Sequence, residues 1–180
     1  MKVLGISGTL FGKKTSSLVN TVLREIQDSN PEIETELLDL SEFQVEFCDG
    51  RPLSAYNNDT QVVLQKIMGS DSFIIGTPIF QASMTGALKN LLDLIPPQAL
   101  RGKVIGFLAT GGTYQHYLVI ENQLKPIAGY FKAYVAPDMI YAHRDHFNER
   151  NEITDPDIIE RIKGFASQVV EMAKVLSPVF

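Results

Sequence analysis

Three short apolar segments, each followed by a loop that contains glycine, serine or threonine, constrain the fold of this chain more than any other feature. They lie within Lys2–Ser7, Asp71–Gly76 and Lys103–Ala109. A continuous apolar run of this length is typical of a parallel strand that is buried on both faces. The pattern therefore predicts buried strands whose carboxyl ends carry polar loops.

Amphipathic helices are predicted between and after these strands. Apolar residues recur at helical spacing over 18–26, 62–68, 84–95 and 158–173. A further helix is expected from His116 to about Phe131, and Pro126 should kink or divide it because proline has no amide hydrogen. Apolar stretches over 33–40 and 133–142 predict two more strands, so strands and helices alternate along the chain.

The alternation predicts an α/β fold with three layers and a five-stranded parallel sheet, because each parallel strand needs a crossover that returns over one face of the sheet. We expect the flavodoxin-like strand order 2-1-3-4-5 within one domain, residues 1–180. Ligands of such sheets bind beyond the carboxyl ends of the strands. The polar loops should therefore meet at one edge of the sheet.

Composition excludes some classes of partner. The chain carries 16 Lys and Arg residues against 21 Asp and Glu, a formal charge of −5, so it has no general attraction for nucleic acid or anionic lipid. No apolar run approaches the roughly 20 residues of a membrane helix, and the N-terminal segment lacks the apolar stretch of a signal peptide. We expect a cytoplasmic protein without a nucleic-acid or membrane partner, in which the single cysteine, Cys48, is a bystander.

The first polar loop, residues 7–17, has the composition of a phosphate-binding site. Hydroxyl side chains, backbone N–H groups and the positive end of a helix dipole converge there, and Lys13 or Lys14 adds a charge. Candidates for the helix N-cap are Thr15, Ser16 and Ser17. The loop matches neither Gly-x-x-x-x-Gly-Lys-Ser/Thr nor Gly-x-Gly-x-x-Gly, which disfavours nucleoside triphosphate and dinucleotide sites. A hydroxyl-rich helix N-terminus beside two solvated lysines is the alternative.

Two other loops favour a planar ligand. In residues 76–89, Pro78 and small neighbours expose main-chain groups, while Phe80 offers an apolar face to a flat heteroaromatic ring. In residues 109–113, two adjacent glycines allow a ligand to approach the backbone closely. Each loop has a purely structural alternative, a core or subunit contact for Phe80 and a tight turn for the glycines. Because all three loops follow parallel strands, a shared site is favoured.

Five segments of these loops carry a common pattern. They are Gly8-Thr9, Thr15-Ser16-Ser17, Thr77-Pro78-Ile79-Phe80, residues 85–93 and Ala109-Thr110-Gly111-Gly112-Thr113. Together they resemble the NAD(P)H-dependent FMN reductase family. The likeness extends through His116 and Leu124-Lys125-Pro126, and it looks closest to the flavin reductases of two-component sulfonate monooxygenase systems.

The resemblance implies a set of FMN-binding residues. Those implied around the phosphate are Thr9, Lys14, Thr15, Ser16 and Ser17. Those implied to contact the isoalloxazine ring are Pro78, Ile79, Phe80 and Gln81, with Gly111, Gly112 and Thr113 close to it. No catalytic side chain is implied, because the flavin itself accepts the hydride.

Two positions depart from the family pattern. Residues 8–11 read Gly-Thr-Leu-Phe where family loops often read Gly-Ser-x-Arg, and Lys14 would supply the missing positive charge. Asn122 stands where close relatives carry an aromatic residue in a locally bulged helix.

The function implied by the resemblance is hydride transfer from NADPH or NADH to FMN, with a flavin-dependent monooxygenase as a candidate recipient of the reduced flavin. A homodimer or homotetramer is implied, in which a second subunit contributes to a shallow site. Two alternatives stay open. One is a reductase of quinones, azo compounds or metal oxyanions that keeps FMN bound, and the other is a non-enzymatic flavodoxin-like electron carrier.

A histidine-containing segment, residues 143–146, resembles a metal site only superficially. Arg144 places a positive charge between the candidate ligands, and the sequence offers no complementary ligand motif, so we expect a solvated loop and no metal. Ring contact and structural packing both stay open for His116, Tyr114 and Tyr117.

Overall fold

Six strands, all parallel, form one sheet in the computed structural model, which describes residues 1–114, 116 and 118–176. They are β1 (Lys2–Ser7), β2 (Glu34–Asp39), β3 (Ser72–Pro78), β4 (Val104–Gly111), β5 (Tyr134–Val135) and β6 (Ile140–His143). The order is β2-β1-β3-β4-β5, and β6 also pairs with β4. The predicted flavodoxin-like order is therefore confirmed.

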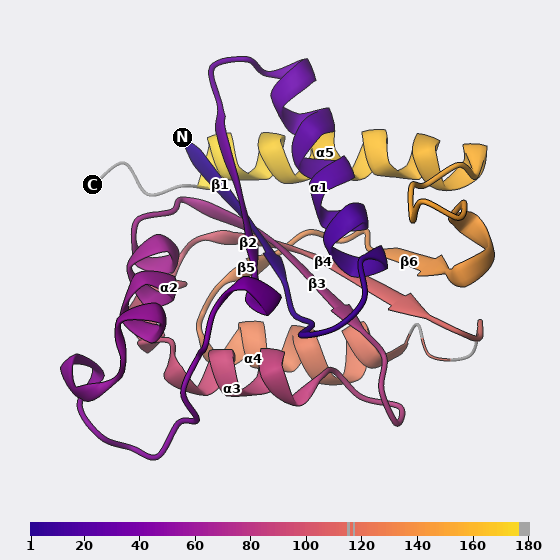
Figure 1. The fold of residues 1–180 in the computed structure, drawn as a ribbon. Coiled ribbons are helices and arrows are strands. Elements are labelled where there is room, and N and C mark those ends of the chain that lie inside the picture. The colour runs from indigo at the N-terminus through magenta and orange to yellow at the C-terminus, as the bar shows by residue number, and fades with distance from the viewer. Residues whose placement is uncertain (115, 117, 177–180) are drawn as a thin grey trace.

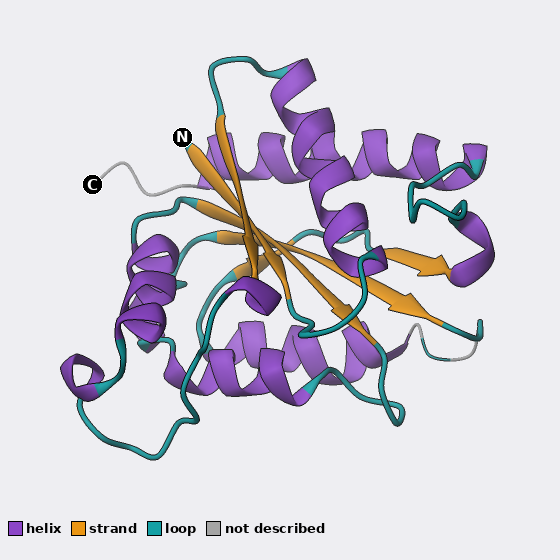
Figure 2. Cartoon of the chain, in the orientation of Figure 1, coloured by secondary structure: helices purple, strands orange, loops and turns teal. Residues whose placement is uncertain are grey.

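Helices cover both faces of the sheet (Figure 1). The α-helices are α1 (Lys14–Ser29), α2 (Asn58–Met68), α3 (Gly86–Leu94), α4 (Lys125–Tyr130) and α5 (Pro156–Leu176). Figure 2 shows α1 and α5 on one side of the strands and α2, α3 and α4 on the other. Within the described part of the chain, no helix is long and apolar enough to cross a bilayer.

Alternating side chains of the central strands fill two apolar cores. Phe73 and Ile75 of β3 face the layer that contains α2, α3 and α4, whereas Ile74 packs in the core formed with α1 and α5. All three side chains are at most 1% exposed. Successive side chains of a strand point to opposite faces, so a strand covered on both faces is apolar throughout. This burial explains the continuous apolar runs in the sequence.

The fifth strand is divided, which the sequence analysis did not predict. Val135 pairs with Ile105 of β4, and pairing resumes where Ile140 meets Leu108. From the first of these pairs to the second, β4 spans three residues, whereas the segment from β5 to β6 spans five. Two residues of that segment therefore have no partner in β4. Pro137 lies in this interruption and has no N–H to donate to a ladder. The predicted single strand over 133–142 is therefore wrong in its continuity.

Pro126 divides the fourth helical segment, as predicted. A π-helix spans Ile120–Leu124, and α4 follows it with Pro126 in its first turn. Within an α-helix the proline ring would clash with the carbonyl group of Asn122, four residues earlier, and the wider π turn relieves this conflict. Gln115 and Tyr117 lie outside the described residues, so the hypotheses for Tyr117 stay untested.

Two glycines provide a test of the packing between β4 and α5. A Cβ at Gly106 would lie 2.5 Å from Cζ of Phe165 and 2.9 Å from Cγ2 of Val169, whereas a Cβ at Gly164 would meet nothing within 4 Å. Gly106→Ala should lower the free energy of unfolding by about 1–3 kcal/mol because it overpacks the core. Gly164→Ala should raise it by about 0.5–1 kcal/mol because alanine favours a helix. Denaturant unfolding measures both, and equal effects would contradict the packing described.

Candidate functional site

A cleft of about 360 Å³ lies where the loops after β1, β3 and β4 meet. Sheet register brings these loops together, because Ser7 lies beside Gly76 and Pro78 beside Thr110. Seven of the predicted site residues line the cleft: Lys14, Thr15, Pro78, Ile79, Phe80, Gly111 and Gly112. The three loops therefore converge, as their positions after parallel strands led us to expect.

Hydrogen bonds to its neighbours hold the loop after β1. The Gly8 N–H donates to the carbonyl group of Gly76 at 2.8 Å, and the Thr85 hydroxyl donates to the carbonyl group of Gly8. The Thr9 hydroxyl donates to the Phe11 carbonyl group at 2.8 Å and accepts from the Phe11 N–H at 3.3 Å. Thr9 is buried and shapes the loop without lining the cleft.

The first turn of α1 lies at the cleft without a capping side chain. The helix begins at Lys14, and within the described ranges no side chain caps it at Lys13. The prediction that Thr15, Ser16 or Ser17 caps the helix is wrong. Thr15 Oγ1 lies 2.8 Å from Thr110 Oγ1, and Ser17 lies inside the helix. The Ser16 hydroxyl donates to the Lys13 carbonyl group at 3.2 Å. The first N–H groups of a helix have no acceptor within it, so this turn is open to an anion.

Cationic side chains from two distant segments border this turn. Lys13, Lys14 and Arg144 all line the cleft. The Lys13 ammonium lies 4.0 Å from a carboxylate oxygen of Asp39, and the Lys14 ammonium lies 5.5 Å from the ring centre of Phe147. Arg144 Nε lies 3.5 Å from a carboxylate oxygen of Asp145, so among the described residues Lys14 is the lining cation without a carboxylate within 4.0 Å. On a chain with a formal charge of −5, any anion-binding site has to be local.

A tight turn presents Phe80 at the opposite end of the cleft. Phe80 and Ser83 exchange two backbone hydrogen bonds of 3.0 Å, and the two residues between them, Gln81 and Ala82, have φ angles of 50° and 58°. Gln123 of the π-helix donates to the Ala82 carbonyl group at 3.2 Å and accepts from the Ser83 hydroxyl at 2.7 Å. The turn is thus fixed from a second element, and the ring of Phe80 stays 55% exposed.

Two side chains of β6 hold the carbonyl groups of the loop after β4. The Tyr141 hydroxyl donates to the Thr113 carbonyl group, and Nε2 of His143 lies 2.8 Å from the Gly112 carbonyl oxygen. Burial raises the pKa of Tyr141, so its hydroxyl keeps the donated proton. Nδ1 of His143 accepts from the Asp145 N–H at 3.3 Å, so Nε2 carries the hydrogen.

These contacts fix the direction of the N–H groups in the same loop. Ala142 lines the cleft, and its neighbours Tyr141 and His143 lie on the other face of β6 because side chains alternate along a strand. A trans peptide group points its carbonyl and its N–H in opposite directions. The N–H groups of Thr113 and Tyr114 therefore point away from Tyr141 and His143.

The two adjacent glycines have different roles. A Cβ at Gly111 would lie 2.0 Å from the Tyr141 hydroxyl oxygen, so glycine there makes room for this side chain. A Cβ at Gly112 would meet nothing within 4 Å. The open space beside Gly112 agrees with the expected close approach of a ligand.

Sequence reasoning did not predict the whole lining of the cleft. Predicted site residues that do not line the cleft are Thr9, Ser16, Ser17, Gln81 and Thr113. Lining residues that it missed are Phe11, Gly12, Thr110, Ala142, Arg144, Phe147 and Asn151. Four of the missed residues lie in or after β6, and no local motif marks them because only the sheet register brings that segment to the cleft.

The histidine segment has a structural role. His143 Nε2 contacts the Gly112 carbonyl oxygen, and His146 Nδ1 accepts from the His143 N–H at 3.1 Å. Tyr114 stacks on the ring of His143 with centroids 4.2 Å apart. Among the described residues, no group of three His, Cys, Asp or Glu side chains is arranged to hold a metal ion. Neither His116 nor His146 lines the cleft.

Comparisons with known proteins bear on this cleft. Residues 1–147 match the family model described as NADPH-dependent FMN reductase. The chain is 63% identical over 172 residues to an NAD(P)H-dependent FAD/FMN reductase of Geobacillus thermodenitrificans, which covers 96% of this chain and 93% of the relative. It is 29% identical to the NADH-dependent FMN reductase SfnF of Pseudomonas putida, which covers 91% of this chain and 88% of the relative.

Solved structures share the fold. FerB of Paracoccus denitrificans, a flavoenzyme NAD(P)H:(acceptor) oxidoreductase, superposes with a TM-score of 0.79 at 17% sequence identity. The match covers 98% of this chain and 99% of that chain. At this identity the likeness concerns the fold alone.

Removing one β6 contact tests how the loop after β4 is held. Tyr141→Phe keeps the ring but loses a hydrogen bond, whose net contribution is about 0.5–1.5 kcal/mol. Amide hydrogen exchange at residues 112–114 should therefore become about two- to tenfold faster. Tyr134→Phe, at the exposed β5, is the matched control and should leave exchange unchanged. Equal exchange in Tyr141→Phe and the parent chain would show that the contact does not hold the loop.

Proposed function

Because the chain belongs to the NADPH-dependent FMN reductase family, we propose that its cleft binds FMN and admits a nicotinamide nucleotide to the flavin ring. As a member of that family it is an oxidoreductase that uses FMN with NADPH or NADH. The observation that carries the proposal is the cleft itself. An uncapped helix N-terminus and an apolar, half-open ring face lie in one hollow.

In this proposal the first turn of α1 binds the flavin phosphate. Its N–H groups, which have no acceptor within the helix, would donate to the phosphate oxygens, and the helix dipole favours a negative charge there. Lys14 and Arg144 would add charge-assisted hydrogen bonds. The hydroxyls of Thr15 and Ser16 are engaged with other groups, so in our proposal these residues contribute backbone N–H groups.

The other end of the cleft has the features needed to orient a flavin ring. Phe80 offers an apolar surface, and the space beside Gly112 is open. When bound, FMN supplies the hydride chemistry. The N–H groups of Thr113 and Tyr114, held in direction by Tyr141 and His143, would stabilise negative charge on the polar edge of the ring.

The relatives' names extend the proposal to substrates and partners. The Geobacillus relative is named for both FAD and FMN, and we propose that this chain also accepts either flavin. We further propose that it supplies reduced flavin to a monooxygenase, as its likeness to sulfonate-system reductases implies.

We propose a homodimer or homotetramer in the cytoplasm, where reduced nicotinamide nucleotides are available. The side chains of Leu10 and Phe11 are 64% and 91% exposed, and Phe11 lines the cleft, which supports a covering second subunit. Association would bury this apolar surface.

Anaerobic mixing tests the activity. The purified chain, mixed with FMN and either NADPH or NADH, should accelerate the loss of oxidised-flavin absorbance over the same mixture without protein. An electron carrier would bind FMN but leave the nicotinamide nucleotide unoxidised. Quinone and azo acceptors, offered in place of free FMN, test the remaining alternative.

Lys14→Ala tests the phosphate end of the cleft. FMN affinity should fall about tenfold or more, because a hydrogen bond to a charged group contributes about 1.5–3 kcal/mol. Riboflavin, which lacks the phosphate, should bind with equal affinity to the parent chain and to Lys14→Ala. Lys163→Ala on the exposed side of α5 is the matched control. A parallel loss of FMN and riboflavin affinity would contradict the assignment, and titration of flavin absorbance measures both.

A further inference from the structure

A second hollow, which we term the α1 groove, continues from the cleft along the outside of α1. It measures about 620 Å³, within the range of small-molecule sites. Its walls come from the exposed side of α1, from Leu37 of β2 and from residues 150–154. Lys13 and Asn151 line both the groove and the cleft, so the two hollows meet at these residues. A ligand held at the first turn of α1 can therefore extend directly into the groove.

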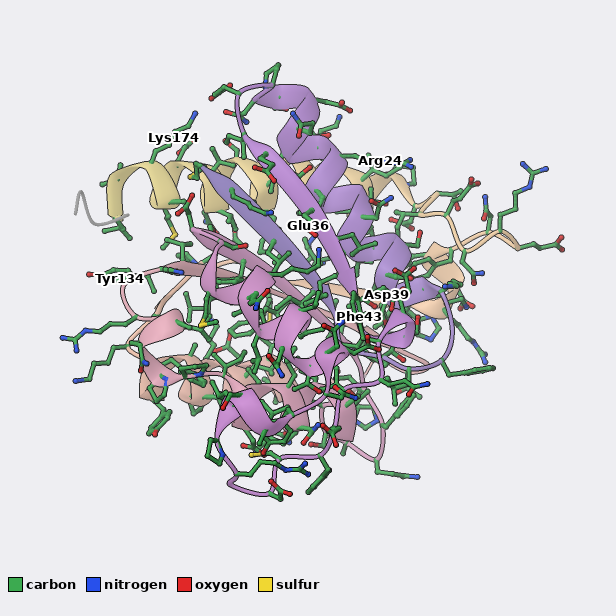
Figure 3. The ribbon with its side chains drawn as sticks, turned by 60° about the vertical axis from the view of Figure 1, so that its left-hand side comes forward. Arg24, Glu36, Asp39, Phe43, Tyr134 and Lys174 are labelled. Atoms are coloured by element: carbon green, nitrogen blue, oxygen red, sulfur yellow. The ribbon has the colours of Figure 1, made fainter. Side chains whose placement is uncertain are left out.

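Polar residues on one face of α1 form the first wall. Ser17, Asn20 and Arg24 lie at positions i, i+3 and i+7, and all three line the groove. Ser17 lies in the first turns of the helix, and Arg24 is about 10 Å further along at 1.5 Å per residue. Arg24 is exposed and lies on the outside of α1 in Figure 3. The wall thus begins at the proposed phosphate position and leads away from the flavin ring.

The second wall is a loop fixed by its own hydrogen bonds. The Asn148 side-chain oxygen accepts from the N–H groups of Arg150 at 2.9 Å and Glu152 at 3.0 Å. The Asn151 N–H donates to the Asn148 carbonyl group at 2.9 Å, and the Thr154 N–H donates to the His146 carbonyl group at 3.0 Å. Arg150 therefore extends from a preformed turn beside the groove.

The groove carries more positive than negative charge. Its charged residues are Lys13, Arg24, Arg150 and Glu152. In the described part of the chain neither arginine has a carboxylate within 4.0 Å, whereas a Glu152 carboxylate oxygen accepts from the Asn148 amide at 2.8 Å. Two arginines without acidic partners, on a chain with a formal charge of −5, favour an anionic ligand.

We propose that the α1 groove binds the adenosine monophosphate portion of FAD while the flavin portion occupies the cleft. The inference rests on the proposed flavin site, because the groove starts where that site holds the phosphate. In FAD, adenosine monophosphate is attached to this same phosphate, so it must leave the cleft at that point. The second phosphate is bonded directly to the first, so Arg150 pairs with it near the start of the groove. Asn20 and Arg24, further along α1, offer hydrogen bonds to the nucleoside.

A comparison of FAD with FMN tests this subsite. Dissociation constants for both oxidised flavins are measured by absorbance titration of the parent chain, Arg24→Ala, Arg150→Ala and the double variant. In the double variant the dissociation constant for FAD should rise about tenfold or more, since each lost charged hydrogen bond costs about 1.5–3 kcal/mol. The constant for FMN should change less than about twofold, because FMN ends before the groove. Arg101→Ala, an exposed arginine beside the start of β4, is the matched control.

Each other outcome overturns part of the account. Unchanged FAD affinity, or an equal loss for FAD and FMN, would remove the proposed subsite. An increase in KM for NADPH with unchanged FAD affinity would assign the groove to the phosphates of the nicotinamide nucleotide instead. A parent chain that binds FMN but not FAD would defeat this inference alone, whereas one that binds neither flavin would defeat the proposed function.

Discussion

The parallel pairing of β1, β3 and β4 is the constraint on which the site depends. It brings residues that are far apart in the chain to one edge of the sheet, where backbone bonds join the loops directly. Gly8 donates to the Gly76 carbonyl group, and Ile79 donates to the Thr110 carbonyl group, each at 2.8 Å. Because two covered faces stabilise these strands, the geometry of the cleft follows from the burial of the core.

Residues that do not face the cleft determine what its backbone can bind. Tyr141 and His143 take the carbonyl groups of the loop after β4, and Gln123 takes a carbonyl group of the turn at Phe80. The N–H groups of Thr113 and Tyr114 thereby point away from Tyr141 and His143, and the ring of Phe80 stays exposed. Preorganised donors of this kind need no rearrangement when charge develops on a bound group. The chain thus contributes orientation and electrostatics, and the flavin would contribute the redox chemistry.

Sequence patterns predicted the strand order and the convergence of the loops because apolar runs and helical periodicity report burial directly. They did not predict the break between β5 and β6, although Pro137, which has no N–H to donate to a ladder, is a local signal of that break. For this reason Tyr141, His143 and Arg144 were not recognised as neighbours of the glycine loop. The hydroxyl residues were recognised, but their hydrogen bonds within the protein were not. Thr15 contacts Thr110, which is 95 residues away.

The most direct measurement of the central claim is a crystal structure of the chain with FMN. The account predicts the phosphate within hydrogen-bond distance of the N–H groups in the first turn of α1, and the ring between Phe80 and the Gly112 loop. A flavin bound elsewhere, or one whose phosphate lies at the Phe80 end of the cleft, would contradict it.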